Sequence, residues 1–78
     1  MERIPLACLG CGETARLSEI NASFRLQRRL CELGFLKGTE LTCIHIAPAG
    51  SPIAVWVRGT IIAIRRNLCE KILVERCC

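Results

Sequence analysis

The order of glycine and proline residues between positions 30 and 64 constrains the fold of this 78-residue chain more than any other feature. Gly34 stands where a helix needs a left-handed residue at its C-terminal end, and Gly38 turns the chain again. The segment Ala47–Pro52 then reverses the chain, and Gly59 reverses it once more. Strand-like apolar runs lie between these turns. A short helix followed by such closely spaced strands predicts a small β-barrel.

The hydrophobic pattern predicts five or six short strands and one inserted amphipathic helix, without a linker. The expected elements are an edge segment over Ile4–Leu9, strands over Glu13–Ile20, Glu40–Ile46, Ile53–Arg58, Thr60–Ile64 and Ile72–Glu75, a helix over Phe24–Leu33 and a helical turn over Arg65–Cys69. An open sheet of these strands would expose its edges, so we expect them to close into a barrel. A chain of this length forms one domain, residues 1–78.

The predicted helix has one apolar face, because Leu26, Leu30 and Leu33 are spaced by four and three residues. We expect all three leucines to pack against the barrel. Asn21 and Ser23 precede the helix and offer side-chain oxygens that can cap its first turn.

The turn residues resemble those of the FeoA family of bacterial ferrous iron transport proteins. In that family a helix ending in leucine and glycine, here Leu33–Gly34, precedes a glycine-threonine turn, here Gly38–Thr39. An alanine-proline-x-glycine-x-proline turn and a valine-arginine-glycine step follow, here Ala47–Pro52 and Val57–Gly59. Related turns occur in the C-terminal domain of iron-dependent transcriptional repressors. The resemblance covers nearly the whole chain and implies a mainly β, SH3-like barrel.

The resemblance also implies a function, that of a cytoplasmic accessory protein of ferrous iron uptake. Such a protein would bind the partner membrane transporter or its GTP-binding domain. The alternative is a stand-alone metal-binding regulatory domain, related to the C-terminal barrel of the repressors. The residues argue against an enzyme, because the chain has no aspartate, one histidine and no phosphate-binding glycine loop. A thiol redox module is a third hypothesis, although a role of the thioredoxin type requires a βαβ unit, which the predicted elements lack.

The charge of the chain narrows the choice of partner. The formal net charge is +4, and the isoelectric point of about 8.8 lies below the value of about 9 that is typical of nucleic-acid-binding domains. We therefore expect no nucleic-acid partner. Arg25, Arg28 and Arg29 share the polar face of the predicted helix and suit an acidic protein surface or phosphates. A solvated face with an ion pair between Arg28 and Glu32 is an equal alternative.

Alternation along the strands assigns their two faces. The residues expected inside the barrel are Leu41, Cys43, Ile53, Val55, Val57, Ile62 and Ile64. The residues expected to point outward are Ile44, Ile46, Ala54, Trp56, Ile61 and Ala63. An exposed tryptophan between isoleucines is typical of a protein-binding hot spot, for the transporter or for a second copy of the chain. The alternative is that the helix covers this face.

Cys8 and Cys11 have the spacing of half a four-thiolate metal site. Cys77 and Cys78 could supply the other half if the first and last strands pair, and Fe²⁺ or Zn²⁺ would be the ion. Such sites normally contain two C-x-x-C pairs, so we expect no tightly bound metal. His45, the one histidine, is expected at the surface rather than as a ligand.

The seven cysteines are odd in number, and no secretory leader is visible at the start of the chain. We therefore expect reduced thiols in the cytoplasm, with the partner recruiting the chain to the inner face of the membrane. Cys43 and Cys69 stand where a small apolar residue would serve, and both are expected in the core.

Overall fold

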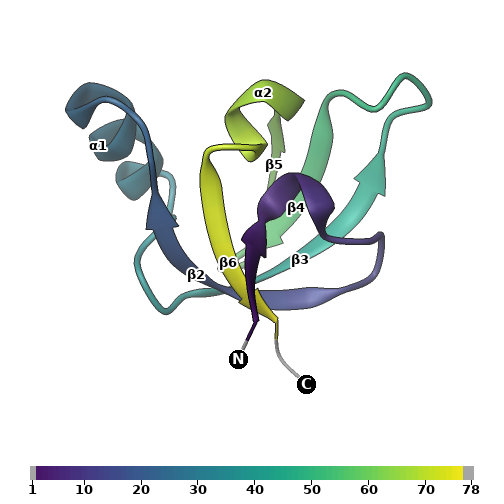
Figure 1. Cartoon of the computed structure of the whole chain (residues 1–78), viewed down its shortest axis with the longest axis horizontal. Coiled ribbons are helices and arrows are strands. Elements are labelled where there is room, and N and C mark those ends of the chain that lie inside the picture. The colour runs from purple at the N-terminus through teal and green to yellow at the C-terminus, as the bar shows by residue number, and fades with distance from the viewer. Residues whose placement is uncertain (1, 77–78) are drawn as a thin grey trace.

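The structure, a computed structural model, describes residues 2–76 (Figure 1). Its elements in chain order are β1 (Arg3–Pro5), the 3₁₀ helix η1 (Leu6–Cys8), β2 (Thr14–Ile20), α1 (Phe24–Glu32), β3 (Glu40–Ile46), β4 (Ile53–Val57), β5 (Thr60–Ile64), α2 (Arg66–Cys69) and β6 (Ile72–Arg76). The predicted bounds of the five strands from β2 to β6 agree with these to within one residue. Glycine and proline turns therefore set the strand limits as expected.

The six strands form one antiparallel sheet in the order β1-β6-β2-β3-β4-β5. The sheet bends around a single core, which is the SH3-like barrel that the sequence predicts (Figure 1). The first and last strands pair as expected, with Ile4 opposite Val74.

The expectation that the barrel closes completely was wrong. Within residues 2–76 no strand pairing joins β1 to β5, which are the two edges of the sheet. The reason lies in β1, which has three residues and ends at Pro5. Proline has no backbone N–H to donate to a further strand, and the chain leaves the sheet at Leu6 to form η1.

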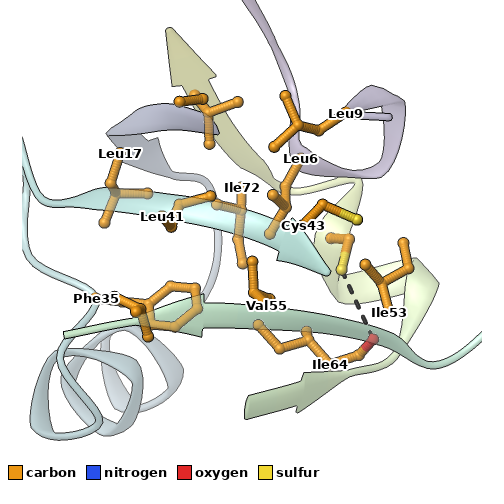
Figure 2. Packing of buried hydrophobic residues seen from close by; sticks show 14 of the residues in the cluster. Leu6, Leu9, Leu17, Phe35, Leu41, Cys43, Ile53, Val55, Ile64 and Ile72 are labelled. Carbon is orange, nitrogen blue, oxygen red and sulfur yellow. Dashed lines mark hydrogen bonds between the residues drawn. The ribbon is translucent and has the colours of Figure 1, made fainter. Parts of the chain in front are cut away.

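The core fills the space enclosed by the curved sheet (Figure 2). The residues predicted to point inward from β3, β4 and β5 are buried, except that Ile62 is partly buried and packs against the core. Leu6 and Leu9, from η1 and the residue after it, are almost completely buried and belong to this core. The apolar side chains from β2 and β6 complete the same cluster.

Helix α1 packs against the barrel through fewer leucines than predicted. Leu30 is buried and Leu26 is partly buried, but Leu33 is 46% exposed, so its placement in the core was wrong. The helix ends at Glu32, and the chain turns sharply after Leu33 because Gly34 adopts a φ of +107°. Phe35, which is 2% exposed, occupies the core beside the helix instead of Leu33.

No helix in the part of the chain that the structure describes has the length and apolar character needed to cross a bilayer.

Candidate partner-binding surface

The β4–β5 hairpin positions the predicted binding surface. The chain reverses over Val57–Thr60, where Arg58 and Gly59 form a two-residue turn with φ angles of +50° and +81°. Two consecutive positive φ angles define a type I′ turn, whose twist matches that of the flanking strands. This turn sets the register of the hairpin, in which Trp56 lies directly opposite Ile61.

Trp56 faces away from the core, as alternation along β4 predicts. Its side chain is 46% exposed, whereas those of Val55 and Val57 on either side are fully buried. Ile61, across the ladder, is 63% exposed, and Ile44 in β3 is 39% exposed. We call Ile44, Trp56 and Ile61 the apolar face. The alternative that the helix covers this face was wrong, since all three side chains remain exposed and α1 lies beside β2 (Figure 1).

A β-bulge in β3 corrects the position of one predicted surface residue. The pairing of β3 with β4 shifts between Cys43 and His45, so that Ile44 has no direct partner. A bulge moves the following residues to the opposite face of the sheet. Ile46 therefore lies opposite Ile53 and packs against the core, and its outward assignment was wrong. His45 is exposed in its place, which confirms its predicted surface position.

The arginines of α1 form a second exposed group, on a helix that is not part of the sheet that carries the apolar face. Arg25, Arg28 and Arg29 are all exposed. None of them lies within 4.0 Å of an acidic group in residues 2–76, so the alternative ion pair between Arg28 and Glu32 is not formed. The predicted partner-binding residues thus fall into two surfaces, one apolar and one cationic.

Only half of the predicted metal site lies within the described residues, because Cys77 and Cys78 fall outside them. Cys8 ends η1, Cys11 lies in the turn that follows, and both are exposed. The thiol of Cys11 donates a hydrogen bond of 3.3 Å to the carbonyl oxygen of Ile44, the bulged residue of β3. From Glu2 to Arg76, no three histidine, cysteine or acidic side chains gather as metal ligands would.

Cys43, which is labelled in Figure 2, and Cys69 are both buried in the core, as predicted. The thiol of Cys69 donates a long hydrogen bond of 3.7 Å to the carbonyl oxygen of Ile64. Burial raises the pKa of Cys69 to about 11, and the neighbouring thiol of Cys43 adds to the shift. Burial also raises the pKa of Cys43. Both thiols stay protonated at neutral pH and act as core side chains rather than as ligands or nucleophiles.

Sequence reasoning did not identify a groove of about 540 Å³ between β2 and α1. Its walls include Glu19, Gln27, Cys31 and Lys37, which come from β2, α1 and the loop after the helix. Its lining mixes polar and apolar residues and includes none of the three residues of the apolar face. No pattern in the sequence could have revealed it, because its walls meet only through tertiary packing.

The curved sheet around one core defines a small SH3-like domain. The FeoA domain matches residues 4–76, so the chain belongs to the FeoA family of ferrous iron transport accessory proteins, as its turn residues predicted. No curated protein matches the chain.

Solved structures of FeoA proteins share this fold. The FeoA protein of Chlorobium tepidum aligns with a TM-score of 0.91 and 33% identity, over 96% of this chain and 71% of that one. The Stenotrophomonas maltophilia FeoA, solved in complex with zinc and described as a prokaryotic SH3 domain protein, aligns with a TM-score of 0.77 and 31% identity, over 90% and 87%. The IdeR protein of T. acidophilum aligns with a TM-score of 0.85 at 20% identity, over 99% of this chain and 35% of that one, which shows the fold alone.

Proposed function

We propose that this chain is a non-enzymatic accessory protein of ferrous iron uptake that acts by binding its partner membrane transporter. The binding site on the transporter would be its soluble GTP-binding domain or its cytoplasmic face. Membership of the FeoA family supports the assignment to ferrous iron transport. The exposure of Trp56 beside Ile61 is the observation that carries the binding role.

The apolar face is the anchor of the proposed contact. Three large apolar side chains on adjacent strands are exposed to water. Their exposure is unfavourable in free energy, and a partner that covered them would remove this cost. Tryptophan is enriched at binding hot spots because it buries a large area at a small cost in conformational entropy. The core fixes the strand beneath Trp56, since Val55 and Val57 on either side are fully buried.

The cationic surface of α1 has a different role in this proposal. Exposed arginines without acidic neighbours attract an acidic protein surface over several ångströms and raise the rate of association. Such exposed charges contribute less to the final affinity than a buried aromatic side chain. We therefore assign Arg25, Arg28 and Arg29 to steering and Trp56 to affinity.

Calorimetric titration with the soluble domain of the ferrous iron transporter from the same organism tests the proposal. Trp56→Ala is expected to weaken binding about 30-fold, the equivalent of about 2 kcal/mol. Leu33→Ala is a matched control, because Leu33 is also 46% exposed but does not belong to the apolar face. Equal affinities for the Trp56→Ala variant and the original chain, or no binding by the original chain, would overturn the proposal.

A further inference from the structure

Strand β5 exposes backbone hydrogen-bonding groups along its free edge. In a hairpin with a two-residue turn, the residues that flank the turn form a hydrogen-bonded pair, and bonded and non-bonded pairs then alternate. Val57 pairs with Thr60, so Ile61 and Ala63 fall in the non-bonded pairs. Their N–H and C=O groups consequently point away from β4, toward the edge.

These four groups have no partner within residues 2–76. β5 is the last strand of the sheet, and neither a loop nor a side chain of the described chain hydrogen-bonds to the backbone of Ile61 or Ala63. Sheet edges are usually protected by a charge, a proline or a bulge, and Thr60–Ile64 contains none of these. The other edge differs, because β1 is short and ends at Pro5.

The charges around β5 indicate what kind of strand fits. Arg58 precedes β5 and Arg65 follows it, both exposed and neither within 4.0 Å of an acidic group among the described residues. A second copy of the chain fits poorly. If two copies paired antiparallel along β5, the Arg58 end of one strand would lie beside the Arg65 end of the other, and like charges brought together in this way are destabilising. Acidic residues at both ends of an incoming strand would match these arginines.

We propose that β5 accepts an extended segment of a partner protein as a seventh strand, with apolar side chains at alternate positions and acidic residues at both ends. The backbone groups of Ile61 and Ala63 supply the hydrogen bonds. The added strand lies beside Ile61, so its apolar side chains extend the apolar face that contains Trp56. The inference deepens the docking function proposed above and rests on it only for the source of the segment.

Amide hydrogen exchange of the labelled chain tests the edge directly. In the free chain the amides of Ile61 and Ala63 should exchange much faster than those of Ile62 and Ile64, which bond to β4. Saturation with the transporter's soluble domain should slow exchange at Ile61 and Ala63 at least tenfold. If the domain binds but both amides stay unprotected, the proposed strand addition at β5 is overturned, whereas the docking function is not. If the two amides instead become protected in the free chain as its concentration rises, a second copy occupies the edge, and the proposal of an acidic partner segment is overturned.

A designed peptide tests, without the transporter, whether the edge of β5 accepts an acidic extended strand. The probe is acetyl-Glu-Glu-Val-Thr-Val-Glu-Glu-amide, and the control peptide has lysine at each glutamate position. The acidic peptide should shift and protect the amides of Ile61 and Ala63 at millimolar concentration and bind at least tenfold more tightly than the control. Equal binding by both peptides, or none by either, would overturn the proposal. Failure of the transporter domain to bind while the acidic peptide does would overturn the docking function alone.

A pair of variants at one position isolates the backbone contribution. Ala63→Pro removes the outward N–H while leaving the ladder to β4 intact, since a proline is tolerated where its nitrogen faces away from the sheet. Ala63→Ser keeps the N–H in the same place. We expect at least tenfold weaker peptide binding for Ala63→Pro and unchanged binding for Ala63→Ser. If Ala63→Pro does not fold, exchange protection in the unmodified chain decides the question, and equal binding by two folded variants would contradict the proposal.

Discussion

Trp56 lies directly opposite Ile61 across the β4–β5 ladder, and both side chains are exposed while the residues on either side of Trp56 are buried. This pair links the local turn to the proposed function. The type I′ turn at Arg58 and Gly59 sets the register, the register places the two side chains on one face, and their exposure leaves an anchor for a partner.

The docking of α1 predicts unequal effects for two leucines. Leu30→Ala should lower the free energy of unfolding by about 2 to 5 kcal/mol, because it leaves a cavity in the core. Leu33→Ala should change it by less than about 0.5 kcal/mol, because Leu33 is half exposed. Urea unfolding measures both, and equal effects of the two substitutions would show that the helix packs differently.

The raised pKa of Cys69 predicts a loss of stability at alkaline pH. The folded chain holds the thiol proton more tightly than the unfolded chain, whose ordinary value is 9.0, so the favourable contribution is complete below pH 9. It is lost as the pH rises toward about 11. The loss is on the order of 2 kcal/mol. Urea unfolding between pH 8 and 11 should show a weaker pH dependence in Cys69→Ala, and an unchanged dependence would contradict the assignment.

The positions of the thiols predict their reactivity toward a thiol reagent at pH 8. Cys8, Cys11 and Cys31 are exposed and should react quickly in the folded chain. Cys43 and Cys69 are buried and should react only on the timescale of unfolding. Mass spectrometry of peptides after timed labelling checks this order, and rapid labelling of Cys69 would show that the core opens there.

The cysteine arrangement predicts no stoichiometric, tightly bound metal. Chain purified without oxygen should contain less than one Zn²⁺ or Fe²⁺ per molecule, and equimolar metal should leave its melting temperature unchanged, since only ligands that bind the folded state raise it. One metal per chain that is lost in a variant carrying Cys8→Ser and Cys11→Ser would favour the metal-binding regulatory domain instead.

Local turn chemistry explains why so much of the fold could be predicted from the sequence. Gly38, Gly59 and the segment Ala47–Pro52 interrupt the chain at positions that few other residues could fill, so the strand limits follow from them. The buried set of β4 followed from simple alternation because the register of that strand against β5 is regular.

The parts that could not be predicted depend on tertiary contacts. No glycine, proline or charged residue marks the bulge at Ile44 in the sequence of β3. The prediction therefore assumed regular alternation through the bulge and placed Ile46 on the wrong face. Leucine periodicity likewise extended the apolar face of α1 by one turn, although Gly34 redirects the chain and delivers Phe35 to the core. The separation of the arginine surface from the apolar face, and the free edge of β5, follow from topology alone.

The most direct test of the central claim uses the single tryptophan of the chain. Chain labelled with 5-fluorotryptophan gives one ¹⁹F resonance, from Trp56, which can be followed while the transporter's soluble domain is added to saturation. If Trp56 anchors the complex, this resonance should shift, broaden and lose its sensitivity to exchange of H₂O for D₂O, because the ring leaves water. An unchanged resonance at a concentration where calorimetry shows complete binding would contradict the account and place the contact elsewhere on the molecule.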